Sequence, residues 1–411
     1  MTITVHRGLD QIGGCITEIR TDSSRVFIDM GQNLPGNGEP TTPKQDKAMV
    51  EALFRNNRRE HEAVIYTHAH EDHIGLFDYV PDGVPQMIGE GAKEIIVEKY
   101  RLLCEADCRA GNDPETNQRK WAKLNTFQTW ARTNQPETFQ IGDISITPFY
   151  NCHSIYDSYM FLIEADGKRV WHMGDYRQHG WNGGKLLKLL KWKATDIDVL
   201  ITEGTMLGRG DECITEKEVA KKMGYVMQAF KYVFVLASAT DIERLASINL
   251  AARIANKSLY VCAGLVNSAM QIFKRRESKK PGDLFDFNPR YYDKGKYLKA
   301  MKKYGFVMVV GVSHFDRIEG LLSQLPEEET LLIYSTWDGY YKEQEQVKQN
   351  PAYKRFRDSF HNIVDIHTSG HASRQTIKDV IETVKPKDGV IGIHKDKGQS
   401  LESLGLSEEI L

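Results

Sequence analysis

The sequence lacks the features that mark membrane, secreted and disordered proteins. It has no uninterrupted run of 18 apolar residues, which a membrane-spanning helix would need. Its six cysteines are scattered, without a Cys-x-x-Cys pair, so no disulfide framework is indicated. The start, MTITVHRG, does not have the basic and then apolar pattern of a secretion signal. We therefore expect a soluble, cytoplasmic protein with reduced thiols and no membrane partner.

The composition and the charge are those of a folded protein with one basic segment. At 411 residues and about 150 residues per domain, we expect two or three domains. A hydrophobic content of 41% and a charged content of 27% are typical of globular chains. The net charge is -2, but residues 206–303 contain 19 Lys and Arg against 10 Asp and Glu. The densest basic runs, 274–280 and 294–303, are expected either to form a solvated helix face or to bind an anionic partner.

The apolar pattern changes along the chain and predicts an α/β fold. Before residue 206, short segments with period-2 alternation predict a strand-rich, antiparallel half, with helices over 47–60 and 93–133. After residue 206, helical and strand patterns alternate, which is typical of a parallel sheet with crossover helices. We find no internal repeat and no low-complexity tract.

The strongest local signal is the string THAHEDHIG, which contains His68, His70, Asp72 and His73 at the end of an apolar strand. Alternate residues leaving a strand point the same way, so His68 and His70 can bind one ion. Imidazole and carboxylate groups suit zinc and related divalent ions. Asp72 and His73 are then placed for a second ion. Three neighbouring histidines have no simple structural explanation, so the string predicts a metal site.

Two ions need more ligands than this string provides. Three isolated residues, each following an apolar run, are the further candidates: His153 in YNCHSIYDS, Asp175 in WHMGDYR and His394 in GVIGIHKD. A lone histidine is more often a packed or surface residue than a ligand. These three become convincing only together with the string at His68.

The combination resembles a known family. HAHEDHIG, preceded by Asp29 in FIDMG and followed by His153 and Asp175, is similar to the metallo-β-lactamase superfamily. Glu203 in ITEGT and His371 in HTSGHAS, with His394 in GIHKDKG, resemble the additional motifs of its β-CASP branch, in the order found in ribonuclease J. The resemblance implies an αββα sandwich formed by residues 1–205 and 361–411, with a β-CASP α/β domain inserted at 206–360.

The resemblance also implies a set of metal ligands. It assigns His68, His70 and His153 to one ion, and Asp72, His73 and His394 to the second. Asp175 would bridge the two ions, and Asp29 would orient a ligand histidine. The cofactors implied are two divalent metal ions, zinc first, with manganese or magnesium as alternatives.

Further residues are expected to act on the substrate. His371 would contact the scissile phosphate or protonate the leaving oxygen, and Glu203 would fix its tautomer. Phosphate contacts are also expected from residues of two loops, with a plain loop role as the alternative for the first pair: Ser313, His314, His367 and Ser369. Trp121, Trp130 and Trp171 are expected to be packing residues.

These expectations together predict a metal-dependent phosphodiesterase that hydrolyses RNA. In the β-CASP branch a histidine at the position of His394 goes with RNA, so RNA is the expected partner and single-stranded DNA the alternative. A hydrolase of a small ester, lactone or thioester is the second hypothesis, because fold does not fix the substrate. A non-catalytic nucleic-acid-binding module is the third. The choice between endonuclease and 5′-exonuclease stays open, as does the oligomeric state.

Overall fold

The chain folds into two compact units. The computed structural model describes residues 1–38, 40–210, 213–293 and 295–406. Unit 1 comprises Met1–Gln178, Asn182–Glu212 and Gly370–Leu411, and unit 2 comprises His179–Trp181 and Cys213–Ser369. That unit 2 is a β-CASP domain stays a prediction. Among the described residues, no helix combines the length and the hydropathy needed to cross a bilayer.

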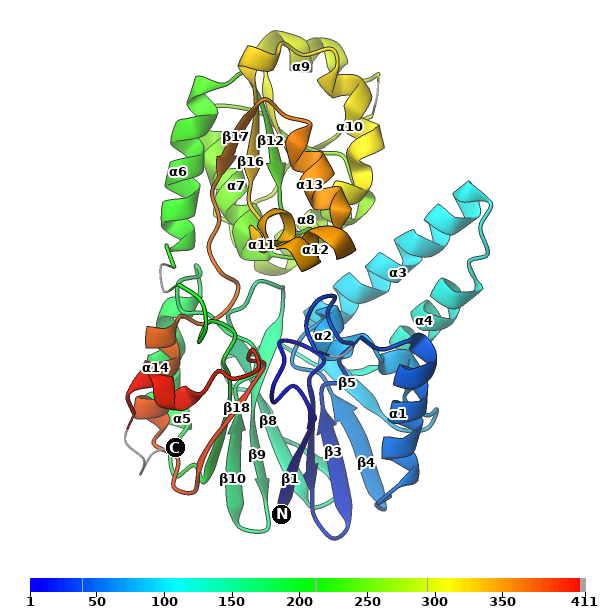
Figure 1. The fold of residues 1–411 in the computed structure, drawn as a ribbon, viewed down its shortest axis with the longest axis vertical. Helices are drawn as coiled ribbons and strands as arrows, with labels where there is room; N and C mark the ends of the chain where they lie inside the picture. Colours follow the sequence, from blue (N-terminus) through cyan, green and yellow to red (C-terminus); the bar gives the residue numbers. More distant parts are fainter. Residues whose placement is uncertain (39, 211–212, 294, 407–411) are drawn as a thin grey trace. The chain divides into compact units, whose positions relative to one another are not determined.

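Unit 1 contains two six-stranded sheets (Figure 1). In the first sheet, the strands lie side by side in the order in which they occur along the chain. Its strands are β1 (Thr2–Arg7), β2 (Ile16–Arg20), β3 (Ser24–Ile28), β4 (His61–Ile65), β5 (Gln86–Gly89) and β6 (Gln128–Trp130). The second sheet has the order β18-β11-β10-β9-β8-β7. Its strands are β7 (Phe139–Ile141), β8 (Ile144–Asn151), β9 (Ser158–Ala165), β10 (Lys168–His172), β11 (Val199–Glu203) and β18 (Gly389–Ile393).

The prediction of an antiparallel first half is only partly right. Strands β1 to β3 and β7 to β10 pair antiparallel, as tight connections allow. From β3 to β6 and from β10 through β11 to β18, however, the pairing is parallel. The reason is that helices connect several of these strands, including α1 (Pro43–Arg55) between β3 and β4. Each sheet is therefore mixed.

The alternation of apolar side chains places helices outside the two sheets. In β3, Val26 and Ile28 join a core cluster with residues of the second sheet such as Phe161, while Phe27 faces α1. In β9, Leu162 faces the opposite way and packs in a cluster that contains residues of the outer helices. Unit 1 is thus a helix-sheet-sheet-helix sandwich. Its outer helices are α1, α3 (Glu90–Ala110) and α4 (Glu115–Asn125) on one side and α5 (Leu186–Lys193) and α14 (Arg374–Val384) on the other (Figure 1).

Two helix predictions are correct in type and wrong in their bounds. The helix predicted over 47–60 is α1, which begins at Pro43 because Thr42 and Gln45 form a capping box. It ends at Arg55. The helical segment predicted over 93–133 is the pair α3 and α4, but its last residues form strand β6. Trp130 and Trp171 are buried, as predicted, whereas Trp121 on α4 is 38% exposed.

Unit 2 contains one sheet of six parallel strands, which confirms the predicted parallel sheet. The order is β14-β13-β15-β12-β16-β17. The strands are β12 (Tyr232–Leu236), β13 (Leu259–Val261), β14 (Arg290–Tyr291), β15 (Phe306–Val310), β16 (Thr330–Tyr334) and β17 (Asn362–Asp365). One face packs in a cluster with helices α9, α10 and α13. The helices are α6 (Glu216–Ala229), α7 (Ile242–Ile254), α8 (Gly264–Glu277), α9 (Leu298–Tyr304), α10 (Phe315–Leu322), α11 (Gly339–Lys342), α12 (Gln344–Gln349) and α13 (Pro351–Asp358).

Candidate metal centre

The predicted ligands of unit 1 gather at the carboxyl ends of strands from both sheets. A mixed sandwich brings several strand ends to one edge, where loops can carry polar side chains without breaking the core. His70 lies just before the short helix α2 (Glu71–Ile74), which carries Asp72 and His73. The residues and the strands that they follow are Asp29 after β3, His68 after β4, His153 after β8, Asp175 after β10, Glu203 ending β11 and His394 after β18.

Three histidine nitrogens of unit 1 converge on one point. His70 Nδ1 lies 3.1 Å from His68 Nε2 and 3.1 Å from His153 Nε2. His68 and His153 are buried, and His70 is half-buried. The ligand atoms of all three residues lie within 4.8 Å of one another, so this group could hold a metal ion.

A second group lies around Asp72. Its Oδ2 atom is 3.0 Å from His394 Nε2 and 3.8 Å from His73 Nε2. All three side chains are buried. The predicted ligands of the second ion are therefore neighbours in the structure, although His394 is far from the other two in the sequence.

Asp175 lies between the two groups. Its Oδ2 atom is within 4 Å of a ring nitrogen in each of five histidines. The distances are 3.1 Å to His73, 3.6 Å to His394, 3.7 Å to His153, 3.7 Å to His371 and 3.9 Å to His68. Among the described residues of this centre, no other carboxylate oxygen has as many imidazole nitrogens within 4 Å. The position is that of a group shared by both sets of ligands.

The unpartnered atoms of this cluster fit a divalent cation. His73 Nε2 and Asp175 Oδ2 are buried, lie 3.1 Å apart and have no partner with hydrogen-bond geometry among the described residues. Leaving such atoms unpaired costs about 1–3 kcal/mol each. A positive ion between nitrogen and carboxylate lone pairs would satisfy both, and nitrogen and oxygen donors are those that zinc and similar ions prefer.

In three of the histidines, a hydrogen bond holds Nδ1 on the side of the ring away from the cluster, so that Nε2 points into the cluster. Asp29 Oδ2 accepts from His73 Nδ1 at 2.7 Å. The carbonyl of Gly370 accepts from His153 Nδ1 at 2.7 Å. Thr205 Oγ1 donates to the carbonyl of His394, so it accepts from Nδ1 of the same residue, at 2.7 Å. Each contact leaves Nε2 as the nitrogen with a lone pair.

Glu203 and His371 form a separate pair beside these groups. Glu203 Oε2 accepts from His371 Nδ1 at 2.9 Å, and Oε1 accepts from the backbone nitrogens of Tyr176 and Ala372. Glu203 is fully buried, while the side chain of His371 is 21% exposed. The carboxylate therefore fixes the His371 ring with Nδ1 directed inward.

Burial and the neighbouring charges set the protonation states. Burial lowers the pKa of His68 and His153 well below the usual range, and lowers the pKa of His70 to about 4. Burial alone would raise the pKa of Asp72 and Asp175, but the surrounding histidines hold both well below the usual range. Neutral imidazoles and ionised carboxylates are the forms that bind metals.

Two other histidines of the centre have the opposite shift. Burial alone would lower the pKa of His73, but Asp175 and Asp29 raise it well above the usual range. For His371, the charges of Glu203 and Asp175 likewise outweigh burial and raise the pKa.

Tight backbone packing holds Asp72 in place. Asp29 and His394 both have a positive φ, of 64° and 52°. Gly31 is required because a Cβ there would lie 1.8 Å from the carbonyl oxygen of Asp72. Gly13 has a φ of 80°, and a Cβ there would come within 2.9 Å of Asp72 Oδ2. The chain therefore leaves Asp72 no room to move toward these loops.

The other predicted phosphate contacts belong to unit 2. Ser313 Oγ lies 2.9 Å from His314 Nδ1 in a short turn after β15. His367 Nδ1 accepts from Arg244 Nη1 at 3.1 Å, and the carbonyl of Ser369 accepts from His179 Nε2 at 2.7 Å. These four residues remain predicted phosphate contacts.

Sequence reasoning missed three residues of the centre. Thr67 Oγ1 donates to Asp29 Oδ2 at 2.8 Å and lies 3.0 Å from His68 Nδ1. Thr205 supports His394, and the Cys15 sulfur lies near the nitrogens of His73 and His394. The two threonines stand beside the motifs at His68 and Glu203, which was the available signal. Cys15 had no such signal, because its strand pattern only indicated burial.

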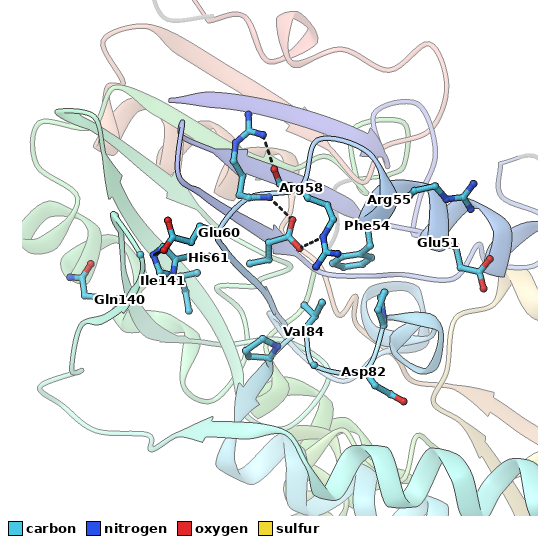
Figure 2. A pocket seen from close by; sticks show the side chains of 16 residues that line it. Glu51, Phe54, Arg55, Arg58, Glu60, His61, Asp82, Val84, Gln140 and Ile141 are labelled. Atoms are coloured by element: carbon cyan, nitrogen blue, oxygen red, sulfur yellow. Dashed lines mark hydrogen bonds and ion pairs between the residues drawn. The ribbon is translucent and has the colours of Figure 1, made fainter.

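A cavity of about 800 Å³ at the other end of β4 is not the candidate site (Figure 2). It is lined by side chains of both charge signs, including Glu51, Arg55, Arg58 and Asp82. None of the predicted site residues lines it.

Comparisons with known proteins identify similar sequences and similar folds. The model described as "Beta-lactamase superfamily domain" matches residues 40–231. An RNase J-like protein of Methanocaldococcus jannaschii is 27% identical over 200 residues, covering 49% of this chain and 41% of that protein. Ribonuclease J of Thermus thermophilus is 27% identical over 255 residues, covering 60% and 42%. Endoribonuclease ysh-1 of Neurospora crassa is 26% identical over 206 residues, covering 48% and 23%.

The chain spans less than half the length of each of these curated relatives. A crystal structure of a protein of unknown function from Enterococcus faecalis has a TM-score of 0.72 and 19% identity, and the match covers 98% of this chain and 95% of that one. That similarity shows that the fold extends over nearly the whole chain.

Proposed function

We propose that the chain is a metal-dependent hydrolase of phosphodiester bonds in RNA, because the Beta-lactamase superfamily domain model matches residues 40–231 and the chain is similar in sequence to ribonuclease J. The observation that carries the proposal is the position of Asp175 Oδ2, within 4 Å of ring nitrogens of His73, His153 and His394. One shared carboxylate between two groups of ligands is the arrangement that a two-metal site requires.

In this proposal His68 Nε2, His70 Nδ1 and His153 Nε2 bind one ion. Asp72, His73 and His394 would hold the second ion, and Asp175 would be shared by both. When bound, such ions would activate water and would stabilise negative charge in the transition state of phosphodiester hydrolysis. We infer zinc from the imidazole-rich donors, with manganese and magnesium as the alternatives to test.

The protein's own contribution is to fix the ligand rings and to supply a proton. Asp29, the carbonyl of Gly370 and Thr205 hold the outer nitrogens, so the ligand rings need no reorganisation. His371, oriented by Glu203 through Nδ1, is the proposed general acid and would protonate the departing oxygen from Nε2.

Substrate contacts are proposed for unit 2. His367, Ser369, Ser313 and His314 would bind phosphate oxygens, and the basic run at the end of α8 would attract the RNA backbone. Similarity to ribonuclease J and to an endoribonuclease favours RNA as the substrate.

The decisive experiment combines metal analysis with product analysis. The full chain, loaded with zinc or manganese, is incubated with 5′-labelled RNA and DNA of matched sequence. Hydrolysis of RNA with about two bound ions per chain supports the proposal, and the product lengths separate endonuclease from 5′-exonuclease. Cleavage of small esters or lactones with none of RNA would favour the alternative hydrolase. Inactivity on RNA and on bis-p-nitrophenyl phosphate would leave only a binding role.

A further inference from the structure

Cys15 is a buried cysteine of unit 1 beside the ligands of the proposed second ion. The residue is 2% exposed and takes part in no disulfide. Its backbone nitrogen donates to the carbonyl of Asp72 at 3.0 Å, and its own carbonyl accepts from the Gly31 nitrogen at 3.0 Å. The backbone of Cys15 is therefore fixed directly against a predicted metal ligand.

The Cys15 sulfur lies close to two further predicted ligands. The sulfur and one ring nitrogen each of His73 and His394 all lie within 4.8 Å of one another, and such a group could hold a metal ion. Gly8 leaves room for the sulfur, because a Cβ there would lie 3.1 Å from Sγ, and its φ of 103° favours glycine. The Gly8 carbonyl also accepts from the His394 nitrogen at 2.6 Å. One glycine thus borders both the sulfur and a ligand histidine.

A second observation, independent of the cysteine, indicates an ion at this place. His73 Nε2 is buried and has no hydrogen-bond partner among the described residues, and the His73 side chain is 1% exposed. Nδ1 of His73 pairs with Asp29, and Nδ1 of His394 pairs with Thr205, so each ring has Nε2 left for an ion. With bonds of about 2.0–2.3 Å, donor atoms around a tetrahedral zinc lie roughly 3.5 Å apart. Shifts of little more than about 1 Å would bring the sulfur and both nitrogens to one ion.

We propose that Cys15 is a thiolate ligand of the second ion and makes that site selective for zinc. The inference rests on the two-ion centre of the proposed function. Thiolate is a soft donor that suits zinc, whereas carboxylate and water suit manganese and magnesium. On binding, the thiol gives its proton to solvent and the sulfur bonds to the ion, so no oxidant or reductant takes part. The first ion, with three histidines as its proposed ligands, would lack this selectivity.

X-ray absorption spectroscopy tests the sulfur bond without any substitution. The full chain is loaded with zinc, and the atoms around the metal are identified by their scattering. We expect about one sulfur at about 2.3 Å for every two zinc ions, with nitrogen and oxygen at about 2.0–2.1 Å. A shell of nitrogen and oxygen alone would overturn the inference.

Cobalt substitution identifies which cysteine supplies the sulfur. A thiolate bound to Co²⁺ gives a sulfur-to-metal charge-transfer band in the near ultraviolet. We expect this band in the wild-type protein and its loss in Cys15→Ser, or in Cys15→Ala if the serine variant does not fold. A band that persists in the folded variant would assign the sulfur to another cysteine and overturn the inference.

Cys152→Ser is the matched control. Cys152 is also buried in unit 1, at 5% exposure, and is the chain neighbour of the predicted ligand His153. Among the described residues, it belongs to no group that could hold a metal ion. The control variant should therefore keep the cobalt band. Loss of the band in Cys152→Ser alone would contradict the assignment to Cys15.

Chelator competition measures the selectivity. We expect Cys15→Ser to weaken the binding of one of the two zinc ions at least about 100-fold, beyond the 10- to 100-fold usual for residues that only orient ligands. Manganese affinity should change less than about threefold, because manganese gains little from a sulfur donor. Equal losses for both metals would show that Cys15 has only a structural role.

These measurements also separate the inference from the proposed function. A zinc–sulfur bond in a protein that hydrolyses no RNA would overturn the proposed function and support the ligand role of Cys15. Hydrolysis of RNA by a zinc-loaded protein without a zinc–sulfur bond would do the reverse.

Discussion

Two clusters of buried charge differ in whether their polar atoms are satisfied. In unit 1, Asp175 Oδ2 and His73 Nε2 are buried without a hydrogen-bond partner among the described residues. In unit 2, Arg244 and Glu216 are as deeply buried, yet they pair with each other and also form hydrogen bonds with the buried Ser335 and Ser247. A cation would complete the first cluster. The second is complete within the protein chain. Buried charge alone therefore does not identify a functional site; in unit 1 it is the convergence of several imidazoles on an unpartnered carboxylate oxygen that does so.

The largest expected effect comes from breaking the first cluster. His70→Ala removes a nitrogen that faces both His68 and His153. We expect loss of bound metal and at least a thousandfold loss of RNA hydrolysis, on the order of the several kcal/mol that metal ions supply. Metal analysis and initial rates check this together. Normal metal content with normal turnover would contradict the ligand assignment.

His371→Ala separates catalysis from metal binding in the same cluster. If His371 protonates the leaving oxygen, the variant should keep its metal and its RNA affinity but lose on the order of 10²- to 10⁴-fold in rate. The loss should shrink for bis-p-nitrophenyl phosphate, whose leaving group scarcely needs a proton. An equal loss on both substrates, with loss of metal, would make His371 a ligand.

A substitution in the second cluster should lower the free energy of unfolding without changing the metal content. Glu216→Ala leaves the Arg244 guanidinium buried without its carboxylate, which typically costs about 3–5 kcal/mol. We expect this loss in the free energy of unfolding with and without added metal. His70→Ala should cost less than Glu216→Ala in the metal-free protein. Chemical denaturation of both variants, each with and without metal, measures the contrast. A metal-dependent loss for Glu216→Ala would argue that the two clusters are not independent.

A smaller effect is expected from the residue that orients a ligand. Asp29→Asn keeps the size of the side chain, but its amide group can donate to His73 Nδ1 and so favour the tautomer with a proton on Nε2. We expect a 10- to 100-fold weaker metal affinity, the usual scale for such partners. Chelator competition measures it. Unchanged affinity would mean that Thr67 and the backbone suffice to orient His73.

The smallest expected effect is a change in salt dependence. Lys274 already pairs with Asp286 at 2.8 Å. The hydrogen bond from the Gly282 nitrogen and then that of Lys274 lower the pKa of Asp286 to about 2. Arg275 and Arg276 are exposed in the last turn of α8. Replacing both by Glu should reduce the slope of log affinity against log salt by about 1–2 for single-stranded RNA. Lys274→Glu alone should change the slope less. An unchanged slope in both variants would mean that the run 274–280 is a solvated helix face.

The sequence predicted local features better than pairings between distant segments. Apolar alternation located most strands, and the string at His68 located three histidines at a strand end. The parallel strand pairs in the unit 1 sheets were not predicted. Period-2 alternation shows which side of a strand is buried, but not which other strand pairs with it or in which direction. The short strand β6 was hidden in a segment whose composition favoured helix. Lys294, in the second basic run, lies outside the described residues.

Networks within the core were the hardest part to predict. Glu216 begins α6 and Arg244 lies in α7, a helix that is buried on nearly all sides, whereas charged residues are usually exposed. Their burial depends on how α6 and α7 pack against each other, which no local pattern encodes. Thr205 was passed over for the same reason. Its partner His394 is brought close only by the pairing of β11 with β18.

That pairing also determines when the cluster can form during protein synthesis. Strand β11 ends at Glu203, and its parallel neighbour β18 begins only at Gly389, after unit 2 has been translated. At 5–20 residues per second, the ribosome needs on the order of 10–40 s to make the intervening chain. Throughout that interval the second sheet of unit 1 has an unpaired edge at β11, and Asp72 lacks its contact with His394. The nascent chain thus has an exposed strand edge, which can pair with another chain, before its histidine and aspartate cluster is complete.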